Sequence, residues 1–77
     1  MRVDGQQLRR LREERGLNQK HVAIEAKIAV SYISMIEAGI RTDVSANVAG
    51  RIATALDVSV SDLRPRAPRI RPRRGDG

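Results

Sequence analysis

The amino-acid sequence predicts an all-α fold: a compact domain of five short helices over residues 1–63, followed by a disordered basic tail over residues 64–77. Helix-start signals recur five times before the tail, and no segment there sustains the apolar–polar alternation typical of a strand. The chain has no Phe or Trp and a single Tyr, so Leu, Ile, Val and Ala must build the core. A length of 77 residues suits one small domain of modest stability.

The first helix is expected to begin after Asp4 and to run to about Arg15. Asp4 is a favoured N-cap, and Gln7 stands three residues later, as in a capping box. Val3 and Leu8 have the spacing of a hydrophobic staple, in which residues before and inside the first turn pack together. These signals together fix the start of the helix.

The second and third helices are expected to follow closely upon each other. Asn18 can cap a helix that ends near Ala26, and a third helix should run from about residue 30 to Ala38, before Gly39. Only about three residues, 27–29, connect them. A connection this short forces a sharp turn, which is the helix-turn-helix arrangement.

Two further helices complete the predicted domain. Ser45 can cap the fourth, in which apolar residues recur every four positions at Val48, Ile52 and Leu56. Ser59 begins the short fifth helix, with Asp62 placed to complete a capping box and Leu63 facing inward. Pro65 disfavours helix at the residue before it.

The net charge of +6 is placed mainly in the tail. Residues 1–63 hold nine Lys or Arg and eight Asp or Glu, a net +1, whereas residues 64–77 hold six Arg and one Asp, a net +5. Pro, Arg and Gly dominate the tail, which has too little apolar surface to fold alone. The tail therefore suits either auxiliary nucleic-acid binding or a solubilising role, and a binding function for the domain must rest on its geometry.

Several classes of function find no support in the composition. The chain has no Cys and one His, His21, so neither a disulfide nor a metal cluster is expected. No apolar run approaches the ~18 residues of a membrane span, and the N-terminus lacks a secretory pattern, so a cytoplasmic protein is expected. We expect no cofactor and no enzymatic activity, because no nucleophile–base pair or phosphate-binding glycine loop is evident.

The two helices around the short turn have distinct inner and outer faces. Ala23 is small where the helices must approach, and helical spacing turns one set of apolar residues inward: Val22, Ala26, Ile28, Ile33 and Ile36. The third helix then presents Val30, Ser31, Ser34 and Met35 outward, with Tyr32 on its flank. Such a face fits a DNA major groove, about 12 Å wide.

Three segments resemble the Cro and phage-repressor (Xre-type) helix-turn-helix family. Gly16-Leu17-Asn18-Gln19, followed by Val22-Ala23, resembles the family's opening, and the segment from Tyr32 to Gly39 is similar to its recognition helix. Ala53, Leu56, Val58 and Leu63 resemble its closing helices. The resemblance covers roughly residues 4–63 and implies a lambda-repressor-like, DNA-binding fold in a bacterial or phage transcriptional regulator.

The resemblance also implies roles for individual residues. Gln19 would bind a phosphate and brace the recognition helix, and Arg41 would meet the DNA backbone. Arg12 and Glu37 would form an inner ion pair between the first and third helices. The expected DNA-binding residues are Gln19, Ala29, Val30, Ser31, Tyr32, Ser34, Met35 and Arg41. Tyr32 faces either the DNA or its own fold. For Gln19, Ser31 and Ser34 the alternative is an ordinary exposed residue, and for Met35 it is a core residue.

The sequence departs from the family at three positions. Lys27 and Asp57 stand where the family favours Gly, and a left-handed Lys costs roughly 1 kcal/mol. Val30 replaces a polar residue, which favours apolar contact with a thymine methyl over hydrogen bonding.

Three functions are therefore compatible with the sequence. The leading one is sequence-specific binding of double-stranded DNA by a transcriptional regulator, as a homodimer at least on DNA and at a palindromic operator. The second is an antitoxin-like module that binds a protein partner as well as DNA. The third is nonspecific nucleic-acid coating through the tail. Val44 and Val60, expected to be exposed, are candidate dimer contacts.

Overall fold

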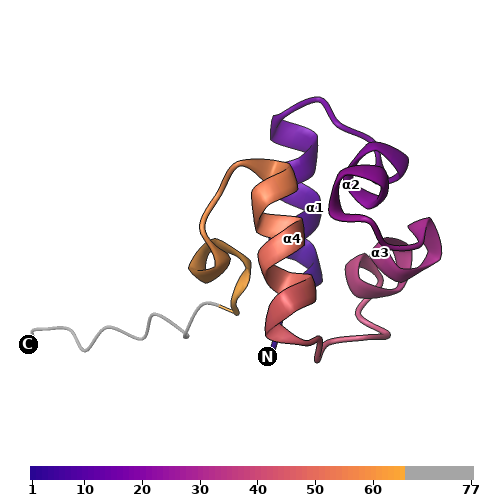
Figure 1. The fold of residues 1–77 in the computed structure, drawn as a ribbon. Helices are drawn as coiled ribbons and strands as arrows, with labels where there is room; N and C mark the ends of the chain where they lie inside the picture. The colour runs from indigo at the N-terminus through magenta and orange to yellow at the C-terminus, as the bar shows by residue number, and fades with distance from the viewer. Residues whose placement is uncertain (66–77) are drawn as a thin grey trace, which may run out of the picture.

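Four α-helices and one 3-10 helix form the fold in a computed structural model that describes residues 1–65 (Figure 1). The elements in chain order are α1 (Gly5–Glu14), α2 (Gln19–Ala26), α3 (Val30–Glu37), α4 (Ala46–Leu56) and the 3-10 helix η1 (Val60–Leu63). The all-α prediction is confirmed over this part of the chain. Residues 66–77, most of the predicted tail, lie outside the described residues. No helix within residues 1–65 is long and apolar enough to cross a membrane.

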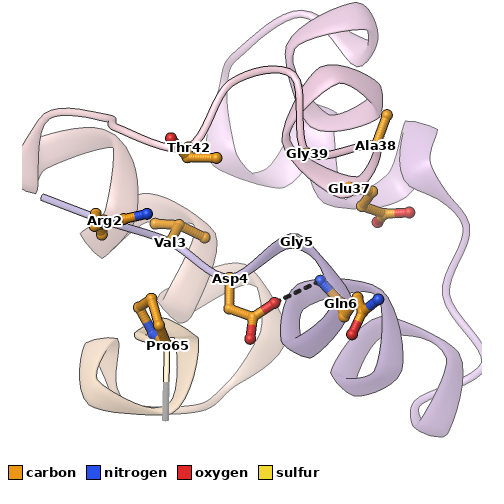
Figure 2. Close-up of a pocket in the computed structure, with 10 residues that line it drawn as sticks. All are labelled: Arg2, Val3, Asp4, Gly5, Gln6, Glu37, Ala38, Gly39, Thr42 and Pro65. Carbon is orange, nitrogen blue, oxygen red and sulfur yellow. Dashed lines mark hydrogen bonds between the residues drawn. The ribbon is translucent and has the colours of Figure 1, made fainter. Parts of the chain in front are cut away.

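Local capping begins three of the α-helices, as the sequence predicts. In each case a side-chain oxygen before the helix accepts a hydrogen bond from a first-turn amide: Asp4 from Gln6 at 2.9 Å, Asn18 from His21 at 2.7 Å, and Ser45 from Val48 at 3.1 Å. Such bonds satisfy amides that have no partner within the helix. Figure 2 shows the bond between Asp4 and Gln6.

The predicted capping box at the start of α1 is wrong. The backbone amide of Asp4, which Gln7 would have satisfied, instead donates to the carbonyl oxygen of Leu63 at 2.8 Å. The Gln7 side chain is buried and accepts a hydrogen bond from Arg10. A hydrogen bond to the end of η1 therefore replaces the local one.

The predicted fifth helix is a single 3-10 turn rather than an α-helix. Its cap is as predicted, since the Asp62 carboxylate accepts the Ser59 amide at 3.0 Å. Arg64 already has extended backbone angles, φ −77° and ψ 151°, as expected of a residue that precedes proline. Only four residues remain between the cap and this break, which is the usual length of a 3-10 segment.

The core lies where all five elements meet. α2 packs against both α3 and α4, while α1 contacts α3 and η1. In Figure 1, α2 and α3 lie on one side of α4 and η1 lies on the other. The buried apolar residues are Val3, Leu8, Val22, Ala23, Ala26, Ile33, Ile36, Val44, Ala49, Ile52, Ala53, Leu56 and Leu63. Val44 is thus a core residue, 4% exposed, and the prediction that it offers a dimer contact is wrong.

An extended N-terminal segment, which the sequence patterns did not reveal, ties the loop after α3 to the rest of the fold. The Val3 amide donates to the Thr42 carbonyl and the Val44 amide to the Met1 carbonyl, both at 2.9 Å. The segment and the loop run antiparallel. Pairing over so few residues leaves no alternation pattern to detect.

Gly5 lets the start of α1 approach the end of α3. A Cβ atom at this position would collide with the carbonyl oxygen of Ile36 and crowd the backbone of Glu37. Figure 2 shows Gly5 facing the turn that holds Glu37, Ala38 and Gly39. The amide-rich end of one helix thus meets the carbonyl-rich end of the other, which is favourable for the two helix dipoles.

Two helices end on non-glycine residues in the left-handed conformation. Lys27, after α2, has φ 60° and ψ 45°, and Asp57, after α4, has φ 59° and ψ 45°. These are the two positions where the resembling family favours Gly. Both turns therefore keep the left-handed geometry that suits Gly, although Lys27 and Asp57 each carry a Cβ atom that strains it.

Replacing Lys27 with Gly should raise the melting temperature. Gly relieves the left-handed strain, and part of that gain is offset by the greater entropy of the unfolded chain, leaving about 0.5 kcal/mol or slightly more. For a domain of this size, that corresponds to about 2–4 °C in a thermal melt. Lys27→Ala is the matched control, because it removes the same charge but keeps the Cβ atom. Equal melting temperatures for the two variants would contradict the prediction.

Candidate nucleic-acid interface

α3 has one face in the core and one face in solvent. Ile33 and Ile36 are fully buried, and their packing fixes the rotation of the helix about its axis. On the opposite side Ser31 and Ser34 are exposed, and Val30 is 41% exposed. Two hydroxyl groups and a valine side chain are therefore presented on one turn-and-a-half of helix that a rigid core holds in place.

The residues flanking this face vary in exposure. Ala29, the residue before α3, is exposed, as is Arg41 in the following loop. Met35 is half-buried, so part of its side chain remains at the surface. Tyr32 is also half-buried and packs against the core. Its ring is thus partly committed to its own fold.

An ion pair joins α1 to the end of α3. The Arg12 Nε donates to Glu37 Oε2 at 2.7 Å, and the Arg12 Nη2 donates to Glu37 Oε1 at 3.0 Å. The third guanidinium nitrogen, Nη1, donates to the Leu17 carbonyl oxygen at 2.8 Å, in the loop before α2. One guanidinium therefore connects α1, the loop before α2 and the end of α3, with the bidentate geometry that makes such pairs strong.

This pair is largely removed from water. The Arg12 side chain is 11% exposed and the Glu37 side chain 5%. The hydrogen bonds to Glu37 raise the pKa of the Arg12 guanidinium above its ordinary value, while burial acts in the opposite direction. The Arg12 guanidinium is accordingly charged when the domain is folded.

Gln19, at the first position of α2, is attached to the same carboxylate. Its Nε2 donates to Glu37 Oε1 at 3.0 Å, which braces the N-terminus of α2 against the end of α3. An amide nitrogen carries two hydrogens, so one N–H remains to meet an external acceptor. The bracing role that the resemblance implies for Gln19 thus has a direct structural basis.

A cavity of about 260 Å³ opens beside Gln19, and its lining includes one residue that the sequence analysis missed. The lining residues are Arg9, Arg12, Gln19, Ser34, Glu37 and Ala38. Arg9 lies one turn before Arg12 on α1, and this i, i+3 spacing was the signal available in the sequence. Its guanidinium bonds to Glu13 at 3.1 Å on an exposed helix face, and Arg9 lines the cavity together with Gln19.

The loop after α3 folds back onto the helix. The amides of Ile40 and Arg41 both donate to the Met35 carbonyl, at 2.9 and 3.1 Å. Gly39, with φ 80°, permits this reversal because glycine adopts a left-handed backbone conformation without strain. Arg41 is thereby held next to the exposed face of α3.

The profile of the helix-turn-helix family matches residues 8–63, and this range contains every helix described above except the start of α1. The chain belongs to the Cro/phage-repressor (Xre-type) helix-turn-helix family. The resemblance noted in the sequence is therefore confirmed.

Similar proteins include known regulators. The transcriptional regulator SinR of Bacillus subtilis is 36% identical over 59 residues, which cover 77% of this chain and 53% of SinR. The restriction-modification controller protein C.AhdI of Aeromonas hydrophila superposes with a TM-score of 0.72 at 39% identity, covering 77% of this chain and 88% of that structure. The chain spans about half the length of the regulators it matches in sequence.

Two structures of SinR with partners are also similar. SinR in complex with DNA has a TM-score of 0.73 at 34% identity, covering 77% of this chain and 94% of that one. SinR in complex with the SinI protein has a TM-score of 0.70 at 34% identity, covering 75% and 56% of the two chains.

Removing either partner of the Arg12–Glu37 pair should destabilise the fold. Arg12→Ala or Glu37→Ala leaves a charge buried without its partner, at a cost on the order of 2–4 kcal/mol in the free energy of unfolding. The double variant should cost less than the sum of the two single variants, because it leaves neither charge stranded. Thermal and denaturant unfolding of all three variants measures these effects.

The Arg9–Glu13 pair on the same helix is a matched control. Its side chains are 62% and 55% exposed, so Arg9→Ala and Glu13→Ala should each change stability by less than about 0.5 kcal/mol. Similar small effects at both pairs would show that burial adds nothing to the Arg12–Glu37 interaction.

Proposed function

We propose that this chain is a transcriptional regulator that binds double-stranded DNA in a sequence-specific manner, with α3 in the major groove. The observation that carries the proposal is the outward face of α3, where Val30, Ser31 and Ser34 are exposed on a helix whose opposite face is fully buried. Membership of the helix-turn-helix family and the similarity to DNA-bound SinR support it.

The contacts would divide into two groups. Ser31 and Ser34, with Met35 beside them, would meet base edges, and the Val30 side chain would meet a thymine methyl. Gln19 and Arg41 would hold phosphates on either side of α3, and Ala29 would bring the backbone before α3 close to the DNA. Phosphate contacts position a protein, whereas base contacts select the sequence.

Two copies would bind an operator with two-fold symmetry. Half-sites on one face of the duplex then lie about 10 base pairs apart, or a multiple of that distance. Val60 remains a candidate contact between the copies, since it is half-buried at the start of η1, whereas Val44 is in the core. Sedimentation with and without DNA tests this assembly.

Replacing Ser31 and Ser34 together with Ala should change the preferred bases at symmetric positions in both half-sites. Gln19→Ala should instead weaken binding to every sequence by a similar factor, because it affects a phosphate contact. Selection of bound sequences from random DNA, followed by titration of the selected sites, measures both effects.

Asn47→Ala/Ser61→Ala is a matched control, because it removes two exposed polar groups that lie outside α3. Its selected sequence should equal that of the wild type. If the Ser31/Ser34 variant also selects the wild-type sequence, α3 does not read bases directly.

The arginines after Pro65 should strengthen binding without changing the preferred sequence. Residues 66–77 contain five Arg and one Asp, at positions outside the described structure. Replacing these five arginines with Gln keeps the chain length, and the slope of log affinity against log salt should fall by about 0.9 for each phosphate that the tail no longer neutralises. An unchanged slope and affinity would assign the tail to another role.

A protein partner is the second candidate function. The similar structure of SinR in complex with the SinI protein supports the proposal that this domain also binds a regulatory protein. Co-purification of a small partner that alters DNA affinity would support an antitoxin-like role. Affinity that ignores sequence and vanishes with added salt would instead indicate nonspecific coating of nucleic acid.

A further inference from the structure

Tyr32 carries a cation on the face of its ring. The guanidinium carbon of Arg41 lies 5.3 Å from the ring centre, within the range of a cation–π contact. The sequence is compatible with two roles for Tyr32, a ring facing DNA or a ring packed against its own fold. The observed contact suggests a third role, in which the ring connects the core to a charged group beside the recognition helix.

Arg41 is held at both ends. Its backbone amide donates to the Met35 carbonyl at 3.1 Å, and its guanidinium rests on Tyr32, which itself packs against the core. Both anchoring residues belong to α3. The guanidinium therefore keeps a defined place relative to the exposed serines, although the Arg41 residue is itself exposed.

The guanidinium also retains its capacity to bind an anion. Within residues 1–65, the carboxylates in ion pairs are bound to other cations, and none lies within 4.0 Å of Arg41. A contact with the face of a ring uses none of the N–H donors of the guanidinium, which lie in its plane. The donors of this exposed side chain remain available for the planar, bidentate recognition of a phosphate.

We propose that Tyr32 is a positioning residue, which holds the Arg41 guanidinium in place for a DNA phosphate and does not itself read a base. The proposal rests on the DNA-binding function above. An arginine that moves freely loses side-chain entropy when it binds, whereas one already held by a ring loses less. Tyr32 thus contributes to affinity through Arg41 alone.

A double-mutant cycle on the full chain tests this coupling, with titration of the selected operator over a series of salt concentrations. Tyr32→Leu should weaken binding about three- to tenfold while the preferred sequence stays the same. Tyr32→Phe, which keeps the ring, should bind as the wild type does. Arg41→Ala should reduce the salt slope by about 0.9. In the Arg41→Ala background, Tyr32→Leu should have no further effect.

Three results would overturn the proposal while leaving the DNA-binding function intact. An equal weakening by Tyr32→Leu with and without Arg41 would show that Tyr32 acts independently of Arg41. A weakening in Tyr32→Phe as large as in Tyr32→Leu would indicate that the hydroxyl group makes the contact. A changed sequence preference would make Tyr32 a base reader. Failure of the wild type to bind duplex DNA in a specific manner would instead overturn the proposed function, and this inference with it.

Nuclear magnetic resonance of the free protein tests the contact without relying on DNA or on the stability of a variant. The chain has no Phe or Trp, so a ring-current shift at Arg41 has Tyr32 as its source, apart from the single imidazole of His21 on α2. The side-chain methylene protons of Arg41 should be shifted upfield in the wild type and in Tyr32→Phe. Unshifted protons in the folded wild type would overturn the proposal.

Discussion

The buried ion pair between Arg12 and Glu37 connects the parts of this domain that must keep a fixed arrangement. Arg12 belongs to α1 and Glu37 ends α3. Arg12 also donates to the Leu17 carbonyl, and Glu37 also accepts from the side-chain amide of Gln19 at the start of α2. In a domain whose core consists of small and medium aliphatic residues, few large contacts are available to fix helix orientation. A bidentate pair with defined geometry supplies that orientation, since a misplaced partner would leave a buried charge unpaired.

Several contacts correspondingly meet at the end of α3. Gly5 brings the start of α1 against the backbone of Ile36 and Glu37, and the ion pair lies next to this contact. The N-terminal segment then secures the following loop through Val3 and Thr42. The exposed face of α3 can therefore consist of small side chains, because the surrounding contacts, rather than that face, determine how the helix is placed.

The same arrangement separates two kinds of contribution to the proposed interface. Ser31 and Ser34 are exposed and make no contribution to the core, so they are free to vary with the sequence to be recognised. Gln19 and Arg41 each connect to the fold through a specific contact, with Glu37 and with Tyr32. In the proposed interface, the side chains held by the fold would contact phosphates and supply affinity. The unconstrained serines would contact bases and supply specificity.

Local chemistry made much of this structure predictable from the sequence. The caps at Asp4, Asn18 and Ser45 and the outward serines of α3 depend on residues within a few positions of each other, so their patterns are visible in the chain. The left-handed Lys27 was expected only from the resemblance to a family that favours Gly at that position. Only the tertiary structure decided the rest: the Asp4 amide bonds to Leu63, Val44 lies in the core, and the Arg41 guanidinium lies over the Tyr32 ring. Each of these outcomes depends on where the chain returns after a turn, and the competition between a local partner and a distant one is settled by packing rather than by spacing.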